Sequence, residues 1–395
     1  QMQTEAHVLQ CSMARHATLA LFHATFGQSR EPCCKKALVA FVDKNQINGI
    51  QRIVRLLVKP NATPILLGLV KIVHNLVGCI PNMMISMDEA LSLSSLNSSA
   101  DIASSGGTGT SVTSTNLFSI LVATLAWSIR SQPPFPGDSP IDRRAELTAE
   151  ILRVLFALRS GGAATKRVET ENPLLMAQLG VILVEILRMP NHDRRCYECK
   201  LAVVVLLIDS PVEYGPFLVV NNVIDQILRI LWIQLNETVV ERAGMVQGER
   251  HAATILPVLI VLNEFSKAHP IIRQMVKDFI FPKENEDEFA TKVQAQLQEE
   301  RIGQVTASGT STGRCRKEDG KKSSSKNMHP LDAPQGTTRW KLIKLMTYTE
   351  SNVKRCSGEL LWTLCGKDSQ EFVLRCGFGN AVHLLGIKGL YKIPR

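Results

Sequence analysis

The cysteines whose spacing is most suggestive of chemistry are Cys196 and Cys199, which form a CxxC pair with His192 four residues before it. Structural zinc sites usually combine two such pairs, and the sequence contains no second CxxC. A redox-active CxxC is expected in a βαβ context, and no strand pattern surrounds this pair. We therefore interpret Cys196 and Cys199 as ordinary thiols near a helix start, and we predict no metal site.

Two glycine-rich stretches resemble parts of phosphate-binding loops. The run 106–109 (GGTG) lacks the Lys-Ser/Thr pair that contacts phosphates and Mg²⁺, and Gly377-Phe378-Gly379 is an isolated GxG more typical of a turn between helices. The sequence also has no His-Glu-x-x-His motif, and its nine histidines are scattered as single residues. We therefore predict no cofactor and no catalytic residue, and expect a regulatory protein that acts by binding.

Basic residues that could recognise an acidic partner are concentrated in the C-terminal fifth of the chain. Residues 314–395 contain 16 Lys or Arg against 7 Asp or Glu, whereas residues 1–313 contain 29 of each. Such asymmetry is compatible with nucleic acid, anionic lipid or an acidic protein, and charge alone does not choose between them. Five of these cations are predicted on two adjacent helices, where they either suit a partner's carboxylates or form a solvated face: Arg339, Lys341, Lys344, Lys354 and Arg355.

Apolar residues recur at helical spacing along most of the chain. A helix at 47–57, a Pro/Asn break and a longer helix at 63–77 form a unit compatible with armadillo and HEAT arrays. The composition, 45% hydrophobic but only 5% aromatic, suits stacked helices that bury aliphatic ridges. We predict an all-α, armadillo/HEAT-like right-handed superhelical solenoid. Its further helix pairs are predicted at 117–130 with 144–158, 174–189 with 198–208, 223–235 with 251–266, and 340–348 with 352–364.

The predicted helix at 63–77 offers a second candidate surface. Lys71, His74 and Asn75 flank the apolar stripe of this helix. In armadillo arrays the longest helix of each repeat lines a concave groove, where polar side chains can bind a peptide or helix. The alternative is an ordinary solvated helix face.

Composition divides the chain into five segments. We predict helical repeats at 1–91, 117–301 and 337–390, a disordered Ser/Gly/Thr-rich loop at 92–116, and a disordered basic Ser-rich insert at 302–336. The uncharged stretch 117–129 is shorter than the roughly 20 residues needed to span a bilayer. Ten cysteines without a secretory start predict a reducing compartment, hence a cytoplasmic protein.

The segment 337–390 contains a series of short motifs: 339–347 (RWKLIKLMT), 353–355 (VKR), 359–361 (ELL), 364–365 (LC), 377–381 (GFGNA), 384–385 (LL) and 389–390 (GL). In these motifs the segment resembles the synembryn family, whose members are non-receptor exchange factors and folding chaperones for heterotrimeric G-protein α subunits. A weaker resemblance extends upstream to about residue 150, through 150–156, 257–262, His269 and Arg273.

The resemblance implies a partner and a mechanism. The chain would bind GDP-loaded, nascent or nucleotide-free α subunits as a monomer, without specific nucleic-acid binding, and promote GDP release because it binds the nucleotide-free state more tightly. It would act in the cytoplasm with recruitment to the cell cortex or plasma membrane, including peripheral membrane association. Lys71 with residues 75–77 is similar to a groove helix of the family. In family members, the segment that corresponds to 337–390 is followed by an acidic, phosphorylatable tail that helps to bind the α subunit. The resemblance therefore does not decide whether this chain has full exchange activity.

Two alternatives come from other classes of function. An armadillo-type peptide-binding adaptor or scaffold would use the same fold without exchange activity. Import adaptors of this type carry a regular ladder of groove Trp and Asn residues, whereas this chain has only four, unevenly placed tryptophans. Binding of RNA or an anionic membrane through residues 314–355 is the third hypothesis. For RNA it predicts affinity that falls steeply with salt.

Overall fold

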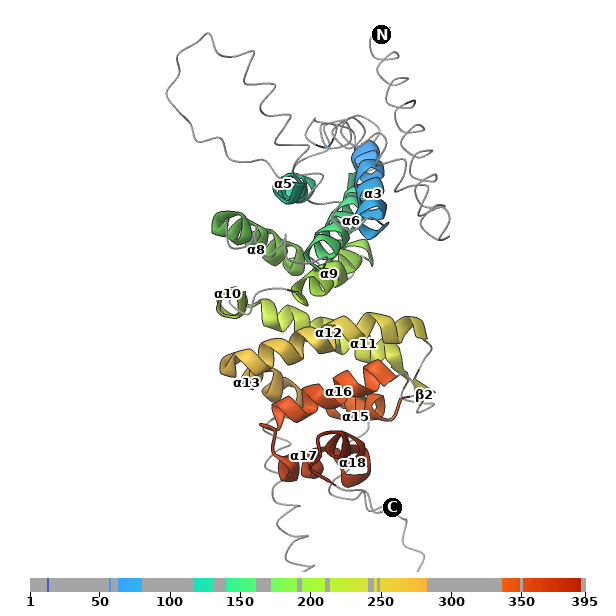
Figure 1. Cartoon of the computed structure of the whole chain (residues 1–395), viewed down its shortest axis with the longest axis vertical. Helices are drawn as coiled ribbons and strands as arrows, with labels where there is room; N and C mark the ends of the chain where they lie inside the picture. Colours follow the sequence, from blue (N-terminus) through green and yellow to red (C-terminus); the bar gives the residue numbers. More distant parts are fainter. Residues whose placement is uncertain are drawn as a thin grey trace, which may run out of the picture. The chain divides into compact units, whose positions relative to one another are not determined.

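The computed structural model describes residues 63–79, 117–130, 140–160, 172–189, 194–209, 214–240, 245–246, 249–282, 336–348 and 351–391, with Met13 and Leu57 as single positions (Figure 1). These residues fall into two compact units, 1–211 and 212–395. The loop predicted at 92–116 lies outside the described residues, as does all of the insert predicted at 302–336 except Gly336.

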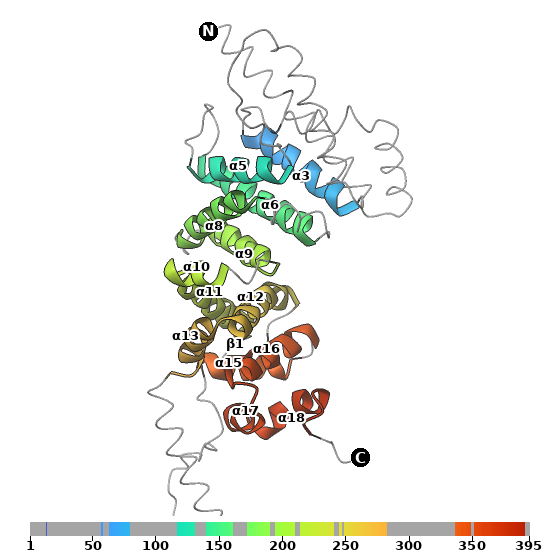
Figure 2. The same ribbon diagram turned by 60° about the vertical axis from the view of Figure 1, so that its left-hand side comes forward.

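The described part of the first unit consists of helices packed in two rows. α3, α6 and α9 contact one another in succession, while α5 packs against α6 and α8, and α8 packs against α9 (Figure 2). The bounds are α3 (Thr63–Cys79), α5 (Leu117–Arg130), α6 (Pro140–Ser160), α8 (Pro173–Arg188) and α9 (Arg194–Leu207).

Local sequence explains why these segments are helical. α8 begins with a capping residue, Asn172, whose side chain accepts a hydrogen bond from the Leu175 amide at 3.1 Å, and Pro173 occupies the first helical position. Its apolar residues recur every three or four positions, and Leu179, Leu183 and Ile186 are almost fully buried. Burial of each such side chain stabilises the fold by about 1.5–3 kcal/mol relative to exposure.

The second unit contains the remaining described helices and one very short hairpin. Its two strands pair antiparallel, with Val239 opposite Val246 and Val240 opposite Met245. The bounds are α10 (Tyr214–Val220), α11 (Val223–Thr238), β1 (Val239–Val240), β2 (Met245–Val246), α12 (Glu249–Ala268), α13 (Pro270–Ile280), α15 (Thr338–Met346), α16 (Ser351–Leu364), α17 (Ser369–Cys376) and α18 (Phe378–Ile387).

Close packing joins the helices of the second unit. α12 packs against α11, α13 and α16, and α16 in turn packs against α15 and α18. A buried hydrogen bond of 2.7 Å joins the side chains of Asn263 on α12 and Thr363 on α16. At Gly215 on α10, an added Cβ would lie 2.2 Å from the His269 ring, so only glycine allows this approach. The helices that carry the C-terminal cations are thus anchored to a packed core.

The structure confirms the prediction of an all-α, armadillo/HEAT-like fold, with the hairpin as a small exception among the described residues. The four helix pairs predicted from 117 onward are present and packed together, with ends within a few residues of the predicted ones. The predicted helix 47–57 lies outside the described residues except for Leu57. Gly377, with φ of 80°, separates α17 from α18 as predicted, whereas Gly379 lies inside α18.

The length and hydropathy of the described helices bear on whether the chain could cross a membrane. Among the described helices, none alone is long and apolar enough to cross a bilayer. α10 and α11 together reach the required length and hydropathy, but only across a bend of 87°.

Candidate functional site, a basic groove in the C-terminal helices

The five predicted C-terminal cations do not form one surface patch. Lys341 on α15 is only 5% exposed, and its Nζ donates a hydrogen bond to Oδ1 of Asn236 on α11. An ammonium group buried without a partner would cost several kcal/mol of free energy. The hydrogen bond to Asn236 offsets part of this cost. Lys341 therefore joins two helices of the second unit.

Arg339 also has a structural role. Its Nε donates to the carbonyl oxygen of Arg375 at 2.8 Å, and its guanidinium lies 5.9 Å from the centre of the Phe281 ring. Arg375 lies over the same ring at 4.6 Å and pairs with Glu371 at 3.2 Å. Burial lowers the pKa of Arg339 below its ordinary value. These contacts tie the start of α15 to the end of α17 and to the end of α13.

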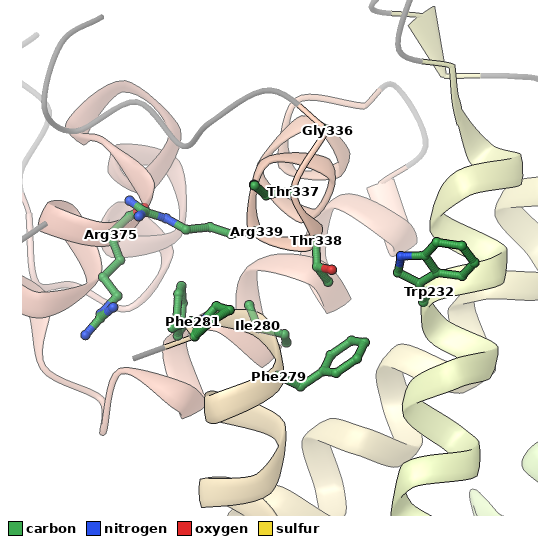
Figure 3. A pocket seen from close by; sticks show the side chains of 10 residues that line it. Trp232, Phe279, Ile280, Phe281, Gly336, Thr337, Thr338, Arg339 and Arg375 are labelled. Atoms are coloured by element: carbon green, nitrogen blue, oxygen red, sulfur yellow. The ribbon is translucent and has the colours of Figure 1, made fainter. Parts of the chain in front are cut away.

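Arg339 and Arg375 line a pocket of about 270 Å³. Figure 3 shows the Arg339 side chain pointing toward Arg375, with Trp232 on the opposite side of the pocket. Trp232 is 54% exposed, and Phe279 adds a second aromatic side chain. Because both guanidinium groups already have intramolecular partners, this pocket has less cationic character than its residue types suggest.

Lys344 is half-buried and lies over an aromatic ring. Its Nζ is 5.4 Å from the centre of the Trp340 ring, one helical turn earlier on α15. Such a cation–π contact at a partly exposed site is worth about 0.5–1 kcal/mol. Lys344 remains at the surface, but its position is set by the tryptophan.

Lys354 and Arg355 on α16 lie together in a groove of about 430 Å³, which we call the basic groove. Lys354 is half-buried and Arg355 is exposed, and neither forms an ion pair with another described residue. The exposed His383 on α18 adds a third basic side chain. The apolar lining of the groove consists of Met346, Gly358, Leu384 and Ile387.

The two helix walls explain how the basic groove forms. On α16, Gly358 lies four residues after Lys354 and three after Arg355. On α18, Asn380 lies three residues before His383 and four before Leu384. An added Cβ at Gly358 would lie 3.4 Å from Leu384 Cδ2, an ordinary van der Waals distance, so this face of α16 lies directly against Leu384 of α18. The nearby carboxylate of Glu359 is paired with Lys388 at 2.9 Å. Among the described lining residues there is no carboxylate.

The candidate residues on α3 face another helix of the first unit. Lys71 Nζ lies 2.6 Å from Glu146 Oε1, and His74 Nδ1 lies 2.6 Å from Glu150 Oε1, both on α6. Asn75 is half-buried beside them. A partner protein that bound Lys71 or His74 would have to replace their pairs with Glu146 and Glu150. These two pairs could not be foreseen from the sequence.

Glu150 is the charged centre of this α3–α6 contact. It also accepts a hydrogen bond from Arg153 at 2.9 Å. Burial raises the pKa of Glu150, but hydrogen bonds and charges from His74 and Arg153 outweigh burial and leave the pKa below its ordinary value. The ionised carboxylate therefore stabilises the folded state at pH values above the ordinary pKa of a glutamate. This contribution disappears as the pH falls through the lowered pKa of the folded state.

We predict that Glu150→Gln lowers the free energy of unfolding by about 1–3 kcal/mol at pH 7, because His74 and Arg153 lose a partly buried charged partner. The difference from the wild type should shrink below about pH 4. Chemical denaturation at several pH values measures both effects. Glu185→Gln is the matched control, since its pair with Arg130 is solvent-exposed and should contribute much less to stability than the buried Glu150 does. An equal cost for both variants would contradict the prediction.

The CxxC cysteines lie in the first turns of α9. Cys199 is 1% exposed, its Sγ donates to the Ala145 carbonyl oxygen at 3.1 Å, and burial raises its pKa to about 12. A thiol with so high a pKa is a poor nucleophile at neutral pH. Cys196 is half-buried, and His192 lies outside the described residues. In the part of the chain that the structure describes, no three His, Cys, Asp or Glu side chains are placed to hold a metal ion.

Sequence reasoning missed the apolar half of the basic groove and His383. His383, Leu384 and Ile387 belong to α18, which was recognised only through short motifs and not as a wall of a site, while Met346 and Gly358 come from α15 and α16. The signal was the spacing of Asn380, His383 and Ile387, which place one face of a helix opposite the face of Lys354 and Ser351. Only the packing of α16 against α18 brings the two faces together.

The structure thus defines a helical-repeat protein with a basic groove in its C-terminal helices. The family model for the guanine nucleotide exchange factor synembryn matches residues 329–393, which include α15 to α18 and the whole groove. The resemblance to the synembryn family, predicted from residues 337–390, is therefore confirmed.

Curated relatives agree with this match. The chain is 24% identical over 264 residues to "Chaperone Ric-8A" of Gallus gallus, covering 65% of this chain and 40% of the relative. It is 25% identical over 252 residues to "Chaperone Ric-8A" of Bos taurus, covering 63% and 40%. The chain spans about two-fifths of the length of these relatives. Among solved structures, an engineered protein is similar with a TM-score of 0.43 and 13% identity, covering 89% of this chain and 92% of that one.

Proposed function

We propose that this chain is a chaperone and guanine-nucleotide exchange factor of heterotrimeric G-protein α subunits. The observation that carries the proposal is the match to the synembryn exchange-factor model over residues 329–393, the segment in which Lys354 and Arg355 line a groove without an ion pair to any described residue. The similarity to proteins named Chaperone Ric-8A supports the chaperone half of the proposal.

The mechanism is differential affinity. A protein that binds the nucleotide-free α subunit more tightly than the GDP-loaded form shifts the partner toward nucleotide release, and needs no covalent chemistry of its own. To shift the ratio of nucleotide-free to GDP-loaded α subunit from 1:99 to 99:1, the chain must bind the nucleotide-free form about 10⁴-fold more tightly. Such a preference requires an extensive interface, which a row of packed helices can provide.

Lys354 and Arg355 are the proposed contacts for acidic side chains of the α subunit. Lys344 on α15 is proposed as a separate contact, because its half-buried side chain lies over Trp340 and does not line the groove. Arg339 and Lys341 support α15 from inside the second unit. Lys71, His74 and Asn75 are retained as a separate proposed contact, provided the pairs with α6 can be exchanged. We further propose that the protein acts as a monomer in the cytoplasm and is recruited to the cell cortex.

The proposal is tested by the rate of GDP release from purified α subunits of several classes, with and without the chain. Faster release from at least one class supports the exchange activity. A higher yield of folded α subunit during cell-free synthesis, without faster release, supports the chaperone half alone. If no class shows either effect, the peptide-binding adaptor becomes the better account of the same fold.

A further inference from the structure

We propose that the basic groove between α16 and α18 is a docking site for an amphipathic helix that carries carboxylates beside its apolar stripe. The inference deepens the proposed function, on which it rests only for the identity of the protein that supplies this helix. The chemistry of the groove itself defines the occupant.

The dimensions of the groove favour a short helix. Its α16 wall extends from Ser351 to Gly358 and its α18 wall from Asn380 to Ile387, eight residues in each case. At 1.5 Å per residue each wall is about 10 Å long, which is about two turns of a docked helix. The volume of about 430 Å³ is sufficient for two or three apolar side chains but not for a folded domain.

The apolar lining needs a partner with hydrophobic side chains on one face. Met346 and Leu384 line the groove with almost no exposed surface, whereas Ile387 is 67% exposed. An exposed isoleucine beside buried apolar side chains provides a surface that a leucine or phenylalanine of a partner could cover. In helix-in-groove recognition these anchors occur three, four or seven residues apart.

The cations decide the charge of the partner. Lys354 and Arg355 point from the same wall, His383 lies on the opposite wall, and no described carboxylate neutralises them. A docked helix would bring its flanking carboxylates within reach of these groups and partly remove water, which strengthens each ion pair. A basic or neutral amphipathic helix would leave the cations unpaired and bind more weakly.

An acidic helix fits better than RNA or a membrane surface. Single-stranded RNA is bound by aromatic side chains on which successive bases stack, and the described lining of this groove includes one Tyr, Tyr348, and no Phe or Trp. A bilayer contacts a convex, exposed apolar face, whereas here the apolar side chains lie between two helices.

The test is fluorescence anisotropy of the full chain with a labelled, helix-forming peptide of about 14 residues. The peptide carries leucines at helical spacing and glutamates beside them, and its counterpart has glutamine at every glutamate. We expect the glutamate peptide to bind at least about tenfold more tightly than the glutamine peptide. The double variant Lys354→Glu/Arg355→Glu should lose this preference. Ile387→Ser should weaken both peptides alike, by about fivefold.

Arg229→Glu is the matched control, because Arg229 is an exposed arginine of α11 without an ion pair among the described residues. It should bind both peptides as the wild type does. Equal binding of the two peptides, no binding of either, or equal effects of the double variant and the control would overturn the inference. Tighter binding of a single-stranded RNA or an anionic vesicle through Lys354 and Arg355 would also overturn it. Peptide binding without any effect on α subunits would uphold the groove and reject the proposed function.

Discussion

Replacing Phe372 by alanine should lower the free energy of unfolding of the second unit by about 3–5 kcal/mol, the usual cost of removing a fully buried aromatic side chain. Phe372 on α17 has no exposed surface, and its ring meets that of Trp362 edge to face at 5.4 Å between centres. Such an arrangement adds about 0.5–1.5 kcal/mol to the effect of burial alone. The substitution would leave a cavity where α17 packs against α16.

Chemical denaturation followed by circular dichroism measures this loss, and hydrogen exchange of α16 to α18 localises it. Phe378→Ala is the matched control, since Phe378 on α18 is 49% exposed. Its ring also meets that of Tyr391 edge to face, with 5.3 Å between the ring centres. It should cost about 1 kcal/mol or less. Equal effects of the two substitutions would show that α17 is not packed as the structure describes.

Replacing Arg339 by alanine should lower the free energy of unfolding by about 2–3 kcal/mol. The substitution removes the charge-assisted hydrogen bonding to the single Arg375 carbonyl oxygen, worth about 1.5–3 kcal/mol in all, and the contact with the Phe281 ring. Arg339→Lys should recover only part of the loss, because an ammonium group lacks the planar donor geometry of guanidinium.

The contrast with Arg355 separates a structural cation from a recognition cation. Arg355→Ala should change the free energy of unfolding by less than about 0.5 kcal/mol, since the side chain is exposed and has no described partner. It should nevertheless weaken peptide binding in the basic groove. Denaturation of both alanine variants under the same conditions measures the difference, and a stable Arg339→Ala protein would contradict the structural role.

The helices could be predicted from the sequence because their apolar residues recur with the period of an α-helix. α8 is an example, since its capping residue Asn172, Pro173 and a continuous aliphatic stripe fix both its start and its buried face. α10, α13, α17 and α18 were not among the helices predicted with bounds. α10 and α17 are only seven and eight residues long, so the periodic pattern is too short to be distinguished from a loop.

The candidate site could be predicted only in part. Residue type and spacing identified Arg339, Lys341, Lys344, Lys354 and Arg355 as a basic cluster, but they do not reveal which side chains are buried. Arg339 and Lys341 point toward partners 36 and 105 residues away in sequence, Arg375 and Asn236. Contacts of such separation leave no local pattern, and the same is true of the pairs between α3 and α6.

Capture of nucleotide-free α subunit tests the central claim most directly. Purified α subunits of several classes are stripped of GDP and passed over the immobilised full chain, the Lys354→Glu/Arg355→Glu variant and the Arg229→Glu control. We expect the wild type and the control to retain at least one class, GDP to reduce this retention, and the double variant to retain less. Failure of the wild-type chain to retain any nucleotide-free α subunit would contradict the account.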